Sequence, residues 1–314
     1  MKSRLLLKIL LLSVLMPLIG NVAFAAGGEL DSNRASWAVI ATVDGEEVKT
    51  SEVDGEYYLF LPGSADLNHI NLRFESLEHN SASVIWQGEK GRANAMTSID
   101  VEAVSQMDHS FRYAMTAVTK EGASFRFYVM RGSEIPTLYL HSDHVGKGRL
   151  WVDASKKNAA TGSLELVTAD GTKIYDGTLT QIKARGNSTF AHYPKKAYQI
   201  KLEKKTDLLG TGEKGKTWVL LANYGDATMM HDKFFKDLAA ELGMDYVTSS
   251  DWVNLYYDGE YRGVYLLGEK VSVGSTGVDI TDMEEAYESE NPLYGDDMSI
   301  AEAENGYGQR DETA

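Results

Sequence analysis

The chain of 314 residues contains no cysteine and only 5 prolines. Without cysteine it can form no disulfide, no thiolate metal site and no cysteine-linked lipid anchor, and it can use no thiol in catalysis. Positive charge is also scarce, because 31 Lys and Arg stand against 46 Asp and Glu, for a formal net charge of -15. Proteins that bind DNA or RNA neutralise its phosphates with a basic surface. The sequence therefore predicts no nucleic acid among the partners.

The rest of the composition is that of a folded protein. Hydrophobic residues make up 43% of the chain and charged residues 25%, and glycine occurs 29 times. These values exclude global disorder and collagen-like repeats. The length allows about two domains, and the excess of glycine over proline indicates many tight turns.

The first 25 residues have the features of an export signal. Lys2, Arg4 and Lys8 give a positive start, residues 5–19 are almost all apolar, and residues 23–25 (Ala-Phe-Ala) form a small-residue cleavage site. The alternative is an uncleaved membrane anchor, for which the apolar run is short. We therefore predict a secreted protein, extracellular or at the cell surface, with no transmembrane segment after signal cleavage.

Residues 26–132 predict an all-β domain. Short apolar segments such as 37–43 and 57–61 stop at turn dipeptides, Asp44-Gly45 and Pro62-Gly63. Repeated strands at such short spacing are typical of a β-sandwich. No group of catalytic side chains stands out in this region, so we expect a spacer or a binding module.

Residues 133–282 predict an α+β unit in which an antiparallel sheet carries one helix. Turn signals divide the strands at Asp170-Gly171, Asp176-Gly177 and Asp258-Gly259. The predicted fold class of the chain is therefore β-rich α+β, with an N-terminal all-β sandwich followed by this sheet and helix.

The helix is predicted over residues 226–242. Asp226 suits its N-cap position, and Gly243 suits the position just after its end. Apolar residues at helical spacing indicate a face that packs on the sheet. These residues are Phe235, Leu238, Ala239 and Leu242.

Beyond residue 282 the apolar pattern stops. Residues 284–314 hold ten acids and a single base, Arg310. Low hydrophobicity with high net charge is typical of disordered segments. We therefore predict an acidic disordered tail over residues 283–314.

Two short patterns could be mistaken for sites. Residues 210–217 match the phosphate-loop pattern G-x-x-x-x-G-K-[ST] letter for letter. A phosphate loop must lead into a helix, whereas residues 218–221 are strand-like, so a β–β connection is favoured. His141, Asp143 and His144 could ligate a metal, but they crowd one short loop where the geometry is poor. We predict no metal site there.

Five segments resemble the CotH kinase family in their order and spacing. They are KARGNST from Lys183, PKKAYQIKL from Pro194, WVLLAN from Trp218, HDKFFKDLAAELG from His231 and GEYRGVYLLGE from Gly259. The resemblance covers roughly residues 135–282. It implies a divergent protein-kinase-like fold that phosphorylates Ser residues of surface or coat proteins, with ATP and Mg as cofactors. Some relatives act instead as surface attachment proteins.

The resemblance also implies a set of site residues. In the strand that ends at Leu202, Tyr198 and Ile200 alternate onto the core face, and Lys196 shares that face while Lys195 does not. An inward lysine needs an anionic partner, and by pattern match Lys196 holds the nucleotide phosphates. The alternative is a Lys196 amine that reaches water at the strand end.

Four further residues complete this predicted nucleotide site. Asp237 or Glu241, on the helix, is the predicted ion-pair partner of Lys196. Arg185 resembles the phosphate-side arginine of the family, although it could equally be a solvated turn residue. Glu269 ends the last strand, where a kinase chain passes from the small lobe to the large lobe, beside the nucleotide.

Acids that hold Mg²⁺ and orient the acceptor hydroxyl are needed for phosphoryl transfer. In this family they follow the Glu269 region, in a helical large lobe that the sequence does not show. We therefore expect a truncated chain that has only the small-lobe part, is catalytically incomplete and has unknown catalytic residues. The alternative is a non-catalytic surface binding or attachment protein.

Overall fold

A computed structural model describes residues 37–76, 83–86, 89–119, 122, 124–144, 146–212, 214–272 and 278. The predicted export signal and the predicted acidic tail lie outside these residues. No helix within the described ranges has both the length and the apolar character needed to cross a bilayer.

The N-terminal half is built from two sheets, one with strand order β2-β1-β5-β8 and one with order β3-β4-β10-β9-β6-β7. Alternating side chains from both sheets fill a shared core that includes Val39, Leu72, Leu59 and Phe127. The elements are β1 (Trp37–Val43), β2 (Glu46–Lys49), β3 (Ser51–Val53), β4 (Glu56–Leu61), β5 (Ile70–Ser76), β6 (Ser83–Trp86), β7 (Glu89–Arg92), β8 (Met96–Ile99), α2 (Val101–Val104), β9 (Tyr113–Thr119) and β10 (Ser124–Arg131).

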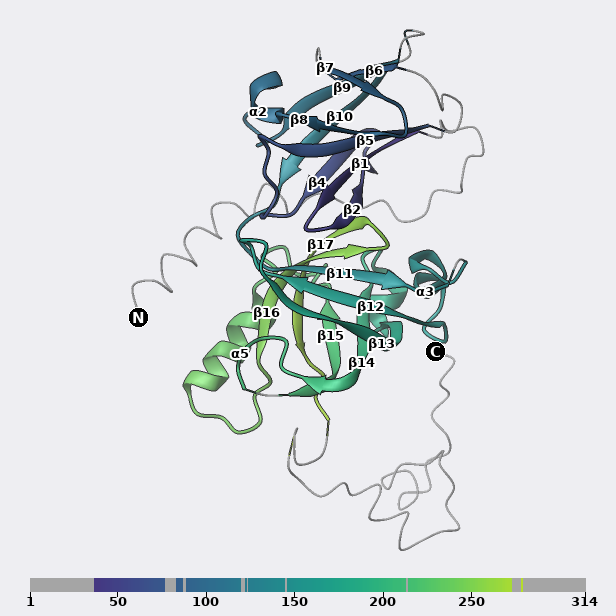
Figure 1. Cartoon of the computed structure of the whole chain (residues 1–314). Coiled ribbons are helices and arrows are strands. Elements are labelled where there is room, and N and C mark those ends of the chain that lie inside the picture. Colours follow the sequence, from purple (N-terminus) through teal and green to yellow (C-terminus); the bar gives the residue numbers. More distant parts are fainter. Residues whose placement is uncertain are drawn as a thin grey trace, which may run out of the picture.

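The described residues of the C-terminal half form seven strands and three helices (Figure 1). They are β11 (Thr137–Ser142), α3 (Arg149–Ala154), β12 (Ala159–Val167), β13 (Lys173–Arg185), α4 (Ser188–His192), β14 (Ala197–Thr206), β15 (Gly215–Leu221), α5 (His231–Glu241), β16 (Ser250–Tyr257) and β17 (Glu260–Glu269). Together the two halves confirm the predicted β-rich α+β fold class.

The seven C-terminal strands close into a barrel. Their order is β15-β14-β13-β12-β11-β16-β17, and β17 pairs back onto β15. A sheet closed in this way has no free edges. Its interior is filled by inward side chains, among them Leu220, Tyr198 and Tyr265, none of which is exposed to solvent. The sheet is antiparallel, as predicted, except for the pair β11–β16, which runs parallel.

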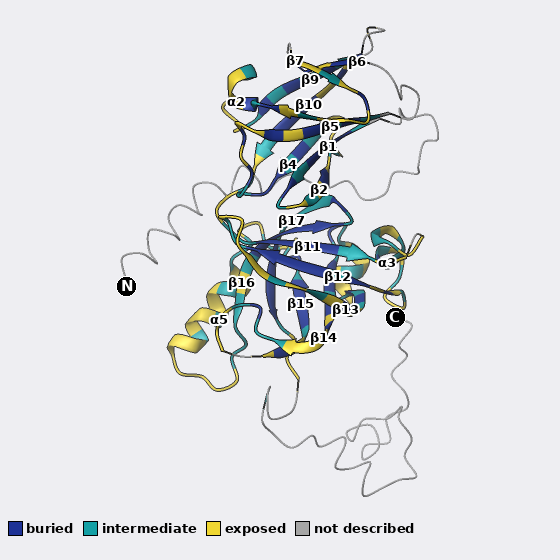
Figure 2. Cartoon of the chain, viewed as in Figure 1, coloured by how far each residue is buried: buried dark blue, intermediate teal, exposed yellow. Residues whose placement is uncertain are grey.

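The two halves share strand pairing and core contacts. Strand β2 pairs with β17 through Lys49 and Glu260, so one sheet of 11 strands crosses the boundary predicted near residue 132. The Tyr256 hydroxyl donates to the carbonyl oxygen of Phe60 at 2.9 Å, and Tyr139 and Tyr256 belong to the core of the N-terminal half. Figure 2 shows buried residues on both sides of this junction.

Three of the four predicted hairpin dipeptides turn the chain and one does not. Asp170-Gly171 lies in the connection between the antiparallel strands β12 and β13, with φ 85° at Gly171. Asp44-Gly45 and Asp258-Gly259 have positive φ at both residues, 57° and 87° in the first and 52° and 81° in the second, as a two-residue type I′ hairpin requires. Asp176-Gly177 does not turn the chain. It lies inside β13, where Gly177 pairs with Leu164 of β12.

Helix α5 differs from its prediction in its start and in its packing. It begins at His231, and Asp226 lies five residues earlier, where its carboxylate accepts the N–H of His231 at 2.9 Å. Gly243 ends the helix with φ 70°, as predicted. The predicted apolar packing face is wrong, because Phe235 is 61% exposed and Leu242 70% exposed. A closed barrel already filled by its own strands offers no open apolar face to this helix.

Candidate functional site

Lys195 precedes β14 and is the buried lysine of this region. Only 7% of its surface is exposed, and its amine donates to the carbonyl oxygens of Ala222 at 3.1 Å and Val264 at 2.5 Å. The prediction that Lys196 takes the inward position is wrong. Strand alternation begins only at Ala197, so it does not govern the two lysines that come before the strand.

The environment of Lys195 disfavours its charged form. Burial, together with the positive charge of Arg262, lowers the pKa of Lys195 to about 7. Its amine lies 4.3 Å from the ring centroid of Tyr265, a cation–π contact that partly offsets the loss of water. No signal in the sequence distinguishes this lysine from its neighbour.

Lys196 instead closes the short helix α4. Its amine donates to the carbonyl oxygens of Phe190 at 2.6 Å and Tyr193 at 2.8 Å. These carbonyls lie at the C-terminal end of α4, where a helix leaves its last acceptors unpaired. A nucleotide-binding role for Lys196 stays a prediction, and its amine would have to give up both bonds to fulfil it.

Arg185 and Lys183 lie on the outer face of the barrel. Their neighbours Ile182 and Ala184 belong to the barrel core, and successive side chains of a strand point to opposite faces. Arg185 is the last residue of β13 and pairs with Ala197 of β14. Both cations are half-buried, and neither has an acidic partner in the part of the chain that the structure describes.

Helix α5 lies outside the barrel and turns two lysines toward it. The Lys233 amine lies 5.7 Å from the ring centroid of Trp252 on β16. The Lys236 amine lies beside Gly268 of β17, 3.5 Å from where a Cβ of that residue would be. Burial lowers the pKa of Lys236; Asp232 opposes this shift, and the nearby charges of Lys233 and Arg185 add to it. Lys236 and Arg185 therefore contribute to one positive region.

The predicted acidic partners on this helix are not brought to Lys196. Asp237 receives the Lys233 amine at 2.5 Å, as an i,i+4 pair on the helix surface. Glu241 is exposed. The face that α5 turns toward the barrel is basic rather than acidic. The apolar periodicity of the helix did not indicate this.

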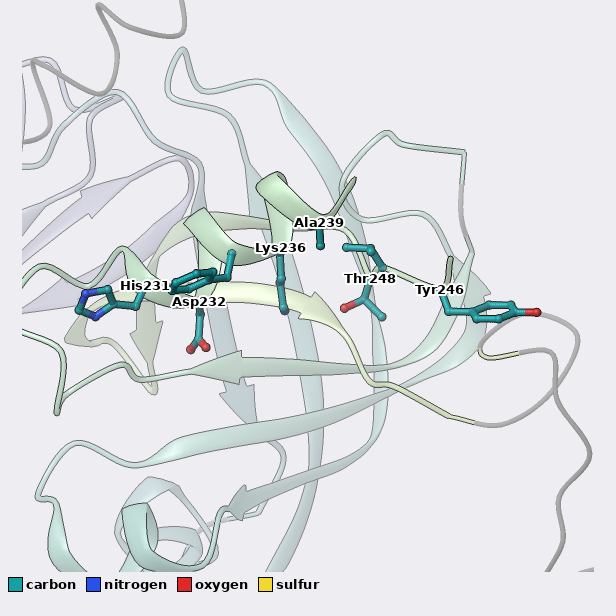
Figure 3. A pocket seen from close by; sticks show the side chains of 8 residues that line it. His231, Asp232, Lys236, Ala239, Tyr246 and Thr248 are labelled. Carbon is teal, nitrogen blue, oxygen red and sulfur yellow. The ribbon is translucent and has the colours of Figure 1, made fainter. Parts of the chain in front are cut away.

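A pocket of about 380 Å³ opens beside this basic face. It lies between α5 and the segment that leads into β16 (Figure 3). In Figure 3 the side chains of Asp232 and Lys236 both point from the helix toward the strands. The lining residues are His231, Asp232, Phe235, Lys236, Ala239, Tyr246, Val247 and Thr248.

Glu269 lies away from Arg185. It ends β17 opposite Trp218 of β15, which in turn pairs with Ile200 and, through it, with Ile182. Ile182 comes three residues before Arg185 on β13. Glu269 is therefore displaced from Arg185 by roughly 10 Å along the strand direction alone. The Glu269 carboxylate packs against Gly215, where an added Cβ would be 2.8 Å from its Oε1. The structure therefore does not bring these two predicted site residues together.

The glycine-rich residues 210–217 lie in the connection from β14 to β15 and in the start of β15, a β–β connection as predicted. The carboxylate of Asp207 accepts four backbone N–H groups of this loop. The donors are Leu209, Gly210, Thr211 and Gly212. The donors that a phosphate would need are thus occupied, and a strand follows where a phosphate loop has a helix.

His141 pairs with the N-terminal half rather than with a metal. Its Nε2 lies 2.8 Å from Oε2 of Glu46 on β2. The hydrogen bond to Glu46 raises the pKa of His141 against the effect of burial, and the charges of Asp258 and Glu165 act in the same direction as the bond. No group of three or more His, Asp or Glu residues that could hold a metal occurs within the described ranges.

A polar cluster at one end of the barrel is missed by the sequence analysis. Arg149 on α3 bonds Asp153 at 3.0 Å and Glu260 at 2.6 Å. The Tyr198 hydroxyl donates to the other oxygen of Asp153 at 2.7 Å. The i,i+4 spacing of Arg149 and Asp153 is the one sequence signal for it. Since every member has a partner, we read the cluster as structural support for α3.

One of the comparisons with known proteins matches the part of the chain that contains this site. A search of curated proteins finds no match. Residues 182–289 match the sequence model of the family described as CotH kinase protein. The match contains Arg185, both lysines before β14, and Lys236 on α5. The resemblance of this region to the CotH kinase family is therefore confirmed.

Proposed function

We propose that the outer face of the barrel beside α5 binds the phosphates of a nucleotide such as ATP. The observation that carries the proposal is the positive region formed by Arg185 and Lys236, with Lys183 on the same face of β13. None of the three has an acidic partner among the described residues. Phosphate oxygens form strong charge-assisted hydrogen bonds with such cations. A kinase-like activity in the matched family supports this proposal.

The cations of this region suit the phosphates of a nucleotide, but its described residues do not offer ligands for the Mg²⁺ that accompanies ATP. Mg²⁺ takes carboxylate and phosphate oxygens, and the described residues contain no cluster of acids or histidines suited to it. We therefore propose that the described residues alone do not catalyse phosphoryl transfer. Incubation with labelled ATP, Mg²⁺ and a Ser-rich acceptor tests this; labelling that requires Arg185 would contradict it.

Nucleotide binding is tested by substitution. We expect Arg185→Ala and Lys236→Ala each to weaken ATP binding tenfold or more, about 1.4 kcal/mol, in calorimetric titration. Lys216→Ala is the matched control, because Lys216 is exposed and lies on β15, after a loop whose N–H groups are bound by Asp207. Equal affinities for the three variants would show that the phosphates bind elsewhere.

A second candidate is attachment to a surface or coat protein. It is favoured by apolar side chains on the outer side of α5, with Phe234 54% and Leu242 70% exposed. Such patches often mark interaction sites. Secretion is part of both proposals, and detection outside the cell of a chain lacking residues 1–25 tests it. In the attachment function, Phe234→Ser with Leu242→Ser would release the exported protein from the surface and leave ATP affinity unchanged.

A further inference from the structure

The pocket beside α5 combines an apolar wall with one cation. Phe235, Ala239 and Val247 supply apolar surface, and the Lys236 side chain enters from the helix (Figure 3). Its volume of about 380 Å³ falls in the range of sites that hold a small ligand or a large side chain. The pocket is thus suited to an apolar or aromatic group that carries a negative charge beside it.

Lys236 is a cation of the pocket lining that has no partner among the described residues. Lys233 is bound by Asp237, and His231 lies 3.0 Å from Asp226. Lys236 has neither a hydrogen bond nor an ion pair within the described part of the chain, although Asp232 lines the same pocket. A half-buried amine gains from an anionic partner that replaces its lost water.

An acidic segment with an aromatic residue follows close by in the chain. The Lys236 amine lies beside Gly268, and β17 ends one residue later, at Glu269. Residues 284–290 read Glu-Glu-Ala-Tyr-Glu-Ser-Glu, with four acids around Tyr287. Val278 lies beside Ser272, because its N–H donates to the Ser272 carbonyl oxygen at 2.8 Å. The six residue steps from Val278 to Glu284 can span up to about 20 Å. Ser272 is only four residues from Gly268, so the segment can reach the pocket.

We propose that residues 284–290 of the same chain dock in the α5 pocket, with Tyr287 against its apolar wall and the flanking carboxylates on Lys236. The attachment through the chain gives the segment a high effective concentration at the pocket. Docking places its negative charges beside Arg185, where they exclude other anions. The segment thereby acts as an internal inhibitor of anion binding. The docking shares Lys236 with the proposed nucleotide site but does not depend on nucleotide binding.

Disulfide trapping in the full chain tests the docking, since the absence of native cysteine leaves only introduced pairs. Ala239→Cys with Tyr287→Cys should form an intramolecular disulfide at least tenfold faster than the control pair Ala239→Cys with Tyr307→Cys. Adding Lys236→Glu, or salt at about 1 M, which reduces the Debye length to about 3 Å, should remove the difference. Equal rates for the two pairs, or no effect of Lys236→Glu, would overturn the proposal. A preference for disulfide-linked dimers would assign the pocket to a second copy instead.

A second measurement leaves the pocket intact. A dye on Ser289→Cys should show restricted rotation by fluorescence anisotropy, and Lys236→Glu should release it, while Lys216→Glu should not. Free rotation in the unsubstituted pocket would contradict docking. Because no nucleotide is present in either experiment, failure here is separable from failure of ATP binding, which is measured by titration.

Discussion

At the residue scale, the buried Lys195 makes the free energy of unfolding depend on pH. Its folded pKa of about 7 lies below the ordinary lysine value of 10.5. Between these two values the unfolded chain binds more protons than the folded one, so the free energy of unfolding rises with pH. The stabilisation is complete above the unfolded pKa and is lost as pH falls toward 7.

We expect Lys195→Met to flatten this dependence. From pH 7 to pH 9 the free energy of unfolding of the parent protein should rise by roughly 2 kcal/mol more than that of the variant. Denaturant titrations at several pH values measure the two slopes. Lys196→Met is the control, and it should retain the slope of the parent. A Lys195→Met protein with the same slope would show that Lys195 is charged in the folded state.

The site residues were only partly predictable from the sequence, for a physical reason. The alternation of Tyr198 and Ile200 predicts the inward face of β14 correctly, because both are buried. Extending the alternation backward to Lys196 fails, since the chain there leaves the strand to close α4. Lys236 carries no signal of its own, because its half-burial depends on how α5 lies across β16 and β17.

At the scale of elements, α5 is the one whose packing contradicts its sequence pattern. Its apolar residues are exposed and its lysines face the barrel. Periodicity predicts that a helix has an apolar face but not that another element will cover it. The short helices α3 and α4, of six and five residues, were not predicted at all. They are too short to show a period and are stabilised by contacts with the barrel.

We expect truncations on α5 to cost little. Phe235→Ala should change the free energy of unfolding by less than about 0.5 kcal/mol, as exposed positions do. Leu220→Ala, in the barrel interior and fully buried, should cost about 2–5 kcal/mol. Chemical denaturation of the two variants compares them directly. If Phe235→Ala instead lowered the free energy of unfolding by about 2 kcal/mol or more, as truncation of a core residue does, then α5 would pack through its apolar side.

At the scale of the whole molecule, the two halves are joined by polar contacts, and the one made by His141 responds to pH. The Tyr139 hydroxyl donates to Asp44 at 3.1 Å, and His141 pairs with Glu46. The pKa of His141 is raised above 6.5, so this pair stabilises the junction fully below 6.5. The contribution is lost as pH rises through the folded pKa.

We expect Glu46→Gln to remove this pH dependence. Over pH 6 to 8 the melting temperature of the parent should fall by about 1–3 °C more than that of the variant, since a partly exposed pair contributes at most about 1 kcal/mol. Calorimetry at fixed ionic strength measures the difference. Glu47→Gln, which instead loses an exposed pair with Arg73, is the matched control. Parallel pH profiles for parent and Glu46→Gln would show that His141 does not sense pH.

Closure of the barrel through β15 and β17 also sets an order of events during synthesis. The last strand, which ends at Glu269, is hydrogen-bonded to β15 and β16, so the ring stays open until this strand has left the ribosome. Until then β15 and β16 present unpaired backbone groups, which other chains could extend. Before β17 has emerged, the nascent chain contains no closed barrel that would prevent it from passing through a narrow channel. The same pairing that removes every edge from the finished barrel therefore delays its locking until nearly the whole of the described chain has emerged.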